Sequence, residues 1–308
     1  MGTVKKLSIS ANQTGQRLDN FLRKSLKGIP KSLLYKVIRD GQVRVNKCRI
    51  KPSYRIQCDD IIRIPPLSTT ESTTISQNKL RESIKKNILF EDKNLLVINK
   101  PSGIAVHSGT KIKNDIVGIL REMKKYKDIT LVHRIDKSTS GCLVLAKNYH
   151  TSSYLGSLFS NKKVSKKYIA LLYGSTKKNS FLISQPIGRE KIKGLKKMTV
   201  VQDGKTSITK FNLIKKFKEA SLFEIDIKTG RTHQIRVHSS KIGHPVCGDT
   251  KYGNKHINQD FRKIGLKRIF LHSYNISFFY KKKFNFTAEM PHDLNEVLHS
   301  LKDNIKGK

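Results

Sequence analysis

The sequence changes character at residues 67–87, and this break limits the fold to two unequal parts. Before it, residues 15–66 contain short apolar stretches with helical and strand periodicity, and after it residues 88–302 contain mainly strand-like runs. The break itself, LSTTESTTISQNKLRESIKKN, lacks apolar periodicity and is rich in Ser, Thr and charge. That composition is typical of a flexible linker. We therefore expect a small front domain at 15–66, a linker at 67–87 and a larger domain at 88–302.

Residues 15–66 have the pattern of a compact α+β module. Apolar residues recur at helical spacing from Leu18 to Leu26, and Pro30 opens a second helical stretch. Gly41 stands where a left-handed residue ends that helix. Alternating residues at 42–46 and an apolar run at 61–64 then predict two short strands.

Residues 88–302 predict a second α+β domain in which strands outnumber helices. The predicted strands are 95–99, 143–146, 168–173, 222–227 and 269–279, and the predicted helices are 115–124, 151–159 and a short one after Arg231. Because the strands come in consecutive blocks, we expect a mixed, mainly antiparallel sheet with helices packed on it. The sequence contains no glycine-rich phosphate loop or dinucleotide motif.

Charge is the strongest compositional signal. The chain has 308 residues, with 62 Lys and Arg against 23 Asp and Glu, a formal net charge of +39. Such an excess favours a polyanionic partner, above all nucleic acid, although a general lysine bias of the genome would also raise it. No uninterrupted apolar stretch reaches 18 residues and the first residues lack a secretory signal, so no membrane contact and a cytoplasmic location are expected. The four cysteines are too few and too scattered for a disulfide framework or a zinc site.

The front module concentrates cations that can read phosphates. They are Arg17, Lys31, Lys36, Arg39, Arg44, Lys47, Arg49 and Lys51. One helix and one hairpin can present them together as an RNA-binding surface. The alternative is an ordinary solvated surface, since helix exteriors normally carry long cations.

Two strings in the second part concentrate groups that can do chemistry. In LVHRIDKSTSG, Asp136 lies two residues after Arg134 in a loop of small residues, and such a carboxylate can be a nucleophile or a base, or only a turn residue. In KTGRTHQIRVH, two arginines and two histidines follow a Gly turn and can bind phosphate or pair with the acid.

Two other kinds of site fit these strings poorly. A metal site built from His233, His238 and His244 is disfavoured because spacings of five and six do not stack on one helical face. A serine hydrolase is disfavoured because no G-x-S-x-G nucleophile elbow is present. We expect no metal.

Both parts of the sequence resemble known families. The string GQRLDNFLRKSLKGIPKSLLYKVIRDGQVRVNK resembles the RNA-binding module first found in ribosomal protein S-four. The strings VHRIDKSTSGCLVLAKN and KTGRTHQIRVH resemble the signature motifs of the RluA-type family of RNA pseudouridine synthases. This second resemblance extends to LLVINKPSGIAVH, KKYIALLYG, GHPVCGDTKYG and RIFLHSYNISF, and it covers residues 88 to the C-terminus.

The resemblance implies roles for particular residues. It places the catalytic Asp at Asp136, the active-site Tyr at Tyr168, the Arg that pairs with the Asp at Arg231, and an aliphatic wall of the pocket at Ile235. It leaves Tyr168 to stack on the base and assist removal of the C5 proton, although from the residues alone a core aromatic is the simpler interpretation. Arg134 is expected to enter the RNA where the target nucleotide leaves its helix, with a structural salt bridge as the alternative.

The implied reaction is the isomerisation of uridine to pseudouridine in large-subunit (23S) ribosomal RNA or its precursor, near the peptidyl transferase centre. Because the reaction needs no redox change and no net hydrolysis, no cofactor is expected. A monomer is the expected state. Asp136 can attack the sugar, attack the base or remove a sugar proton, and the sequence leaves all three open. The rival functions are an RNA-binding ribosome-assembly factor without catalysis, and an RNA methyltransferase, which would need a glycine-rich cofactor loop.

Overall fold

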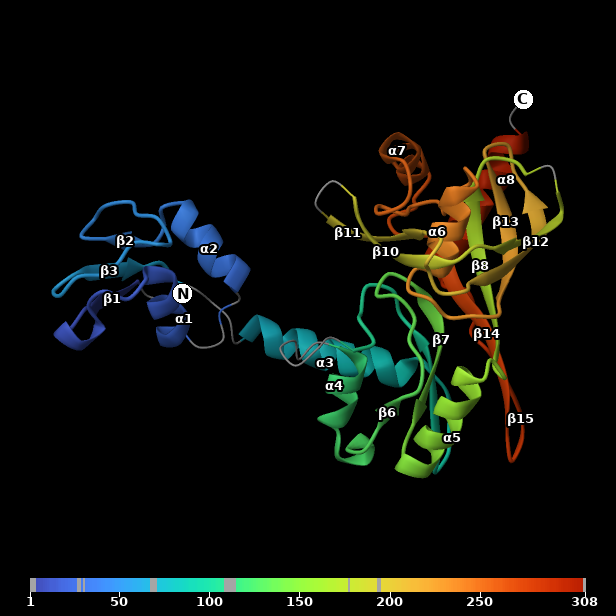
Figure 1. The fold of residues 1–308 in the computed structure, drawn as a ribbon, viewed down its shortest axis with the longest axis horizontal. Helices are drawn as coiled ribbons and strands as arrows, with labels where there is room; N and C mark the ends of the chain where they lie inside the picture. Colours follow the sequence, from blue (N-terminus) through green and yellow to red (C-terminus); the bar gives the residue numbers. More distant parts are fainter. Residues whose placement is uncertain are drawn as a thin grey trace. The chain divides into compact units, whose positions relative to one another are not determined.

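The chain forms two compact units, Met1–Lys79 and Leu80–Lys308, each described here by itself. The structure is a computed structural model, and it describes residues 4–26, 29, 31–66, 71–107, 115–176, 178–192 and 195–306. Figure 1 shows the elements of both units.

The first unit is a small antiparallel sheet packed against two helices. Its elements are β1 (Lys5–Ser8), the 3₁₀ helix η1 (Ala11–Gln13), α1 (Leu18–Ser25), α2 (Lys31–Arg39), β2 (Arg44–Val45) and β3 (Ile61–Ile64), with sheet order β1-β3-β2. Alternate residues of β3, Ile62 and Ile64, are buried together with Leu18 and Leu22 of α1. Gly41 follows the end of α2 and has a positive φ of 69°, as the sequence predicted. Strand β1 was not predicted, and it extends the module before residue 15.

The expected flexible linker is wrong for most of its length. Residues 71–86 form helix α3 (Glu71–Lys86) instead of a coil. Leu80 and Ile84, four residues apart, lie on one face of this helix and pack in the core of the second unit, where Ile84 is 1% exposed. Two apolar residues are too few to produce a visible periodicity, which is why the sequence pattern missed the helix. Residues 67–70 lie outside the described part of the chain.

The second unit is built on a large mixed sheet. Its strand order is β4-β5-β7-β14-β8-β13-β12-β9, with β6 paired to β7 and β15 paired to β14. The strands are β4 (Ile88–Glu91), β5 (Leu95–Lys100), β6 (Thr130–Leu131), β7 (Ser140–Ala146), β8 (Ser165–Tyr173), β9 (Ser180–Ser184), β12 (Ile208–Lys216), β13 (Ala220–Ile227), β14 (Leu271–Tyr280) and β15 (Lys282–Thr287). Strands β7 and β14 are parallel and the other pairs are antiparallel, which confirms the mixed, mainly antiparallel sheet. A separate hairpin joins β10 (Ile187–Ile192) to β11 (Leu195–Val200).

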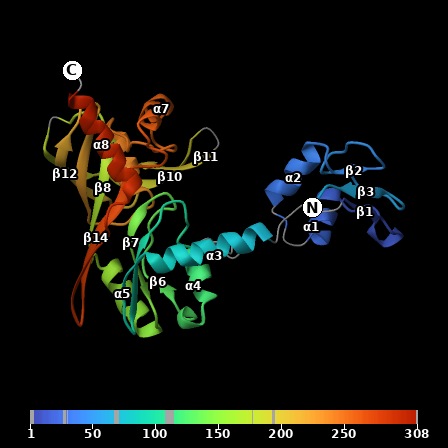
Figure 2. The same cartoon turned by 180° about the vertical axis from the view of Figure 1, so that it is seen from behind.

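Helices cover both faces of the sheet. They are α4 (Ile116–Arg121), the 3₁₀ helix η2 (Lys124–Tyr126), α5 (Tyr149–Ser160), α6 (Gln234–Lys241), α7 (Lys255–Lys263) and α8 (His292–Lys306). Figure 2 shows α8 lying across the sheet on one face, and Figure 1 shows α6 on the other. The described part of the chain contains no helix with the length and apolar character needed to cross a bilayer.

Strand alternation decides what each face carries. On β8, Tyr168, Ala170 and Leu172 pack in the core beneath α4 and α6, whereas Ile169 and Leu171 pack against α7 and α8. Tyr168 is therefore on the face that also carries Ile135 and Ile235. The functional site is built on this face.

Candidate active site

Asp136 lies in the loop between β6 and β7. The side chain of Ile135 is buried and anchors the loop, while the Asp136 side chain is 21% exposed. Strand β7, which follows the loop, has Gly141 as its second residue. Gly141 has φ of 114° and lies so close to β14 that a Cβ there would clash with the Ser273 carbonyl oxygen. Only glycine fits this position. The parallel pairing of β7 with β14 therefore fixes the position at which the Asp136 loop joins β7.

The turn at residues 101–104 is hydrogen-bonded to this loop. The ammonium of Lys100, fully buried, donates to the carbonyl oxygens of Pro101 at 2.9 Å, Ile104 at 2.9 Å and Lys137 at 3.2 Å. The Gly103 amide also donates to the Lys137 carbonyl, at 2.9 Å. Burial lowers the pKa of Lys100 to about 7. The turn at 101–104 thus holds the backbone next to Asp136.

The carboxylate of Asp136 is paired with Arg236. The Arg236 Nη1 atom lies 3.2 Å from Asp136 Oδ2, and its Nε and Nη2 atoms each lie 2.8 Å from the Asp249 carboxylate. Asp249 is fully buried and accepts further bonds from the amides of Lys251 and Tyr252. Burial opposes its charge, but the bonds from Arg236 outweigh burial and lower the pKa of Asp249. Asp249 therefore fixes the guanidinium that faces Asp136.

The predicted pairing of Asp136 with Arg231 is corrected by this geometry. Within the described part of the chain, the Asp136 carboxylate forms its ion pair with Arg236, and the His233 ring lies 3.8 Å from it. Arg231 donates through Nε to the Thr206 carbonyl at 3.2 Å, although it does line the same hollow as Asp136. The physical reason is the position of α6, which starts at Gln234 and carries Arg236 into the site on its first turn.

The loop before α6 is held by a buried polar network. Gln234 accepts bonds from the Thr229 hydroxyl at 2.7 Å and the Arg231 amide at 3.1 Å, and it donates to the Ile208 carbonyl and the Thr209 hydroxyl. His233 takes a left-handed conformation, φ of 58°, to enter the helix. These bonds set the direction of the first turn of α6, and hence of Arg236.

His233 closes another side of the site. Its Nε2 lies 3.8 Å from Asp136 Oδ2, and its Nδ1 is hydrogen-bonded to the Tyr252 hydroxyl at 2.8 Å. Burial lowers the pKa of His233, so the ring is neutral at physiological pH. The ring of Tyr252 lies 5.1 Å from the Arg236 guanidinium carbon and packs on it.

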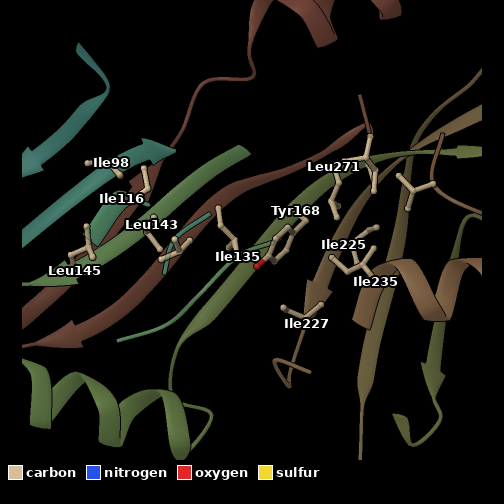
Figure 3. Packing of buried hydrophobic residues seen from close by; sticks show 14 of the residues in the cluster. Ile98, Ile116, Ile135, Leu143, Leu145, Tyr168, Ile225, Ile227, Ile235 and Leu271 are labelled. Carbon is tan, nitrogen blue, oxygen red and sulfur yellow. The ribbon is translucent and has the colours of Figure 1, made fainter. Parts of the chain in front are cut away.

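Tyr168 forms the apolar wall opposite the charged groups. Figure 3 shows its ring among Ile135, Ile225, Ile227 and Ile235. Burial raises the pKa of its hydroxyl well above the ordinary value, so the phenol keeps its proton. The hollow at Asp136 is lined by Arg134, Ile135, Asp136, Thr139, Tyr168, Ile227, Gly230, Arg231, His233, Gln234, Ile235, Arg236 and Leu271. It joins one carboxylate to a flat apolar wall, which is the arrangement that a planar base needs beside an ionised acid.

The sequence-predicted site residues fall into two groups. Asp136, Tyr168, Arg231, Arg134 and Ile235 all line one hollow. Arg17, Arg39, Arg44 and Lys47 belong to the first unit, where the last three are exposed and Arg17 is bonded to Asp19 at 2.8 Å. The side chain of Lys31 lies outside the described residues.

The three histidines considered for a metal have other partners. His233 is bonded to Tyr252, His238 to the Thr209 hydroxyl at 2.8 Å and the Gln185 carbonyl at 3.0 Å, and His244 to the Tyr173 carbonyl at 2.8 Å. In the part of the chain that the structure describes, no three His, Cys, Asp or Glu side chains gather as a metal site.

Sequence reasoning missed three residues of the site: Arg236, Asp249 and Tyr252. Arg236 stood in the quoted string KTGRTHQIRVH, and Asp249 and Tyr252 stood in GHPVCGDTKYG. The sequence offered one signal, which was the presence of a second arginine and a further aspartate in these strings. Only the position at which α6 begins shows which arginine lies beside Asp136.

Comparisons with known proteins agree with this architecture. The family model described as RNA pseudouridylate synthase matches residues 94–241, and that of the S4 domain matches residues 16–62. The chain is 39% identical to ribosomal large subunit pseudouridine synthase C of Pasteurella multocida, covering 97% of this chain and 94% of that protein. It is also 39% identical to the protein of the same name from Haemophilus influenzae, covering 98% and 96%.

A solved structure gives the same result. Human RNA pseudouridylate synthase domain containing 4 superimposes with a TM-score of 0.62 at 25% identity, covering 74% of this chain and 98% of that one. The fold and its RNA-binding front domain thus define an RNA-modifying isomerase. The chain belongs to the RNA pseudouridylate synthase family, with an S4 domain in front of the synthase domain.

Proposed function

We propose that this protein isomerises specific uridines of 23S ribosomal RNA, near the peptidyl transferase centre, with Asp136 as the catalytic carboxylate. The relatives that match almost the whole chain are named for the large ribosomal subunit. The observation that carries the proposal is the hollow that is lined both by Tyr168 and by Asp136, which is paired with Arg236. Because ribosomal RNA is made and assembled in the cytoplasm of bacteria, the reaction belongs there.

The chemistry needs a base that leaves its helix and turns. The bond from C1′ to N1 breaks, the uracil rotates, C1′ bonds to C5, the C5 hydrogen is lost to solvent, and N1 takes up a proton. Once the nucleotide is flipped out, the face of the base would lie against the wall formed by Tyr168, Ile227 and Ile235. Arg134, exposed at the rim, is placed to fill the space that the flipped nucleotide leaves.

Each residue of the site then has a separate task. Asp136 supplies the carboxylate, whether it attacks the sugar, attacks the base or removes a sugar proton. Arg236 orients that carboxylate by a charge-assisted hydrogen bond, and Asp249 orients Arg236. Tyr168 enters the reaction as a neutral phenol, so it provides a stacking surface from the start and can take part in proton removal from C5 only after losing its own proton.

The test is tritium release from 23S rRNA transcribed with uridine labelled at C5. The wild-type protein should release tritium, and Asp136→Asn should release less than about 0.1% as fast, because the amide cannot serve as nucleophile or base. RNA affinity of Asp136→Asn should stay within a few-fold of wild type. Turnover retained by Asp136→Asn would contradict the mechanism, and tight binding without release by the wild type would favour the assembly-factor function.

A further inference from the structure

A second hollow adjoins the one at Asp136. It has a volume of about 320 Å³ and lies between the end of α5, strand β8 and the loop after β13. Its walls include Arg134, Tyr168, Ile227, Gly230 and Arg231, which also line the hollow at Asp136. The two hollows are therefore adjacent and share these five residues.

The second hollow is lined by cations and by no acid. Its charged residues are Arg134, Lys162, Lys166, Lys228 and Arg231. Among the ion pairs of the described residues, none includes these five side chains. The carboxylate of Glu224 on β13 pairs with Lys167, whose side chain lies on the opposite face of β8 from Lys166, at 2.9 Å. The positive charge in this hollow is therefore uncompensated by protein.

Lys166 is the central group. It lies two residues before Tyr168 on β8, so the two side chains share a face of the sheet. Its ammonium lies 3.7 Å from where a Cβ on Gly230 would be, next to Arg231. Burial, and then the charge of Arg231, lower the pKa of Lys166. Two partly buried cations that line the same hollow repel each other unless an anion lies between them.

We propose that Lys166 and Arg231 form a subsite for a backbone phosphate of the RNA, next to the target nucleotide; this rests on the proposed function. A phosphodiester is the anion that every flipped nucleotide brings with it on either side. An arginine offers two parallel donors to its oxygens and a lysine offers a point charge. Lys162 and Lys228 stand at the exposed rim of the same hollow. In this proposal Arg231 binds RNA, whereas the sequence analysis expected it to pair with Asp136.

The experiment couples a change in the protein to a change in the RNA. A short synthetic hairpin containing a uridine that the enzyme modifies is prepared with one charged phosphate beside that uridine replaced by a neutral methylphosphonate, one position at a time. Affinity is measured with Asp136→Asn, which binds without turnover. At one position the methylphosphonate should weaken binding about tenfold, and adding Lys166→Met should weaken it less than twofold further.

The matched control is Lys163→Met, which removes an exposed lysine three residues away that does not line the hollow. Its effect should be independent of the methylphosphonate. Independent effects of Lys166→Met and the methylphosphonate at every flanking position would overturn the subsite. If the wild type modifies no uridine at all, the proposed function fails instead, and the two failures are distinct.

A second measurement tests the free protein. Because Lys166 lies beside Arg231 without a carboxylate, Lys166→Met should leave the Tm unchanged or raise it. A clear fall in Tm would show that the ammonium stabilises the free protein and would overturn the argument.

Discussion

In the first unit, Arg39, Arg44 and Lys47 are exposed to solvent, whereas in the second unit Arg236 is 8% exposed and lies between two carboxylates. Exposed cations interact with RNA across water and are screened by salt, so we expect each of them to contribute a small and interchangeable share of affinity. Arg236 has one geometry, which is fixed by Asp249, and we expect its role to depend on that geometry. The comparison predicts that the same residue type provides affinity in one region and orientation in the other.

The largest effect is expected from Arg236→Lys. Lysine keeps the charge but cannot bond Asp249 with two nitrogens and Asp136 with a third, so kcat should fall about 100-fold to 1,000-fold. Arg231→Lys should act mainly on KM. Single-turnover and steady-state rates on the same RNA separate the two. A larger loss of kcat for Arg231→Lys than for Arg236→Lys would restore the assignment made from sequence.

Substitutions of Tyr168 test the contribution of an uncharged wall of the site, in contrast to that of the arginines. Tyr168→Phe keeps the ring and removes the hydroxyl, whereas Tyr168→Leu removes both. Since stacking of a base on an aromatic ring is worth about 1–3 kcal/mol, the Leu variant should react about 10-fold to 100-fold more slowly than the Phe variant. Equal single-turnover rates for the two variants would show that the hydroxyl, and not the ring, is what the reaction uses.

Lys100 tests what a buried cation costs when its hydrogen bonds in the described part of the chain go to carbonyl groups. Its pKa is lowered to about 7 by burial, from 10.5 in the unfolded chain. Between these values the unfolded state binds the proton and the folded state does not, so stability rises with pH, by up to about 1.4 kcal/mol per pH unit from this group. Lys100→Gln should flatten that rise between pH 7 and 9. Denaturant unfolding at several pH values measures it, and an unchanged slope would contradict the assignment.

The sequence predicted the fold where local patterns were strong. The helices at 116–121, 149–160 and 234–241 and the strands β5, β7, β8, β13 and β14 lie where apolar spacing placed them. The pattern failed at α3, whose contact with the core is carried by Leu80 and Ile84. It also failed at the hairpin of β10 and β11, whose sequences IGREKI and LKKMTV lack the alternation of apolar and polar residues that predicts a strand.

The sequence predicted which residues form the site better than it predicted which of them contact each other. Asp136 and Tyr168 follow from motifs that the family shares, and both line one hollow. The partner of Asp136 depends on the residue at which α6 begins, and element boundaries are what sequence patterns locate least well. Asp249 is hydrogen-bonded to Arg236 although it stands 13 positions later in the sequence. The loop between them brings the two together, and local sequence patterns do not predict the course of such a loop.

The smallest effect is expected in the first unit, from the combined change Arg39→Gln, Arg44→Gln and Lys47→Gln. If these exposed cations together account for about one phosphate contact, their loss should weaken RNA binding about fivefold to tenfold near 0.15 M salt and reduce the slope of log affinity against log salt by about one. The matched control replaces Lys215, Lys216 and Lys218, exposed lysines of the second unit, with Gln. Because both triple variants lose the same charge, an equal change in slope would show that net charge, and not the surface of the front module, attracts the RNA.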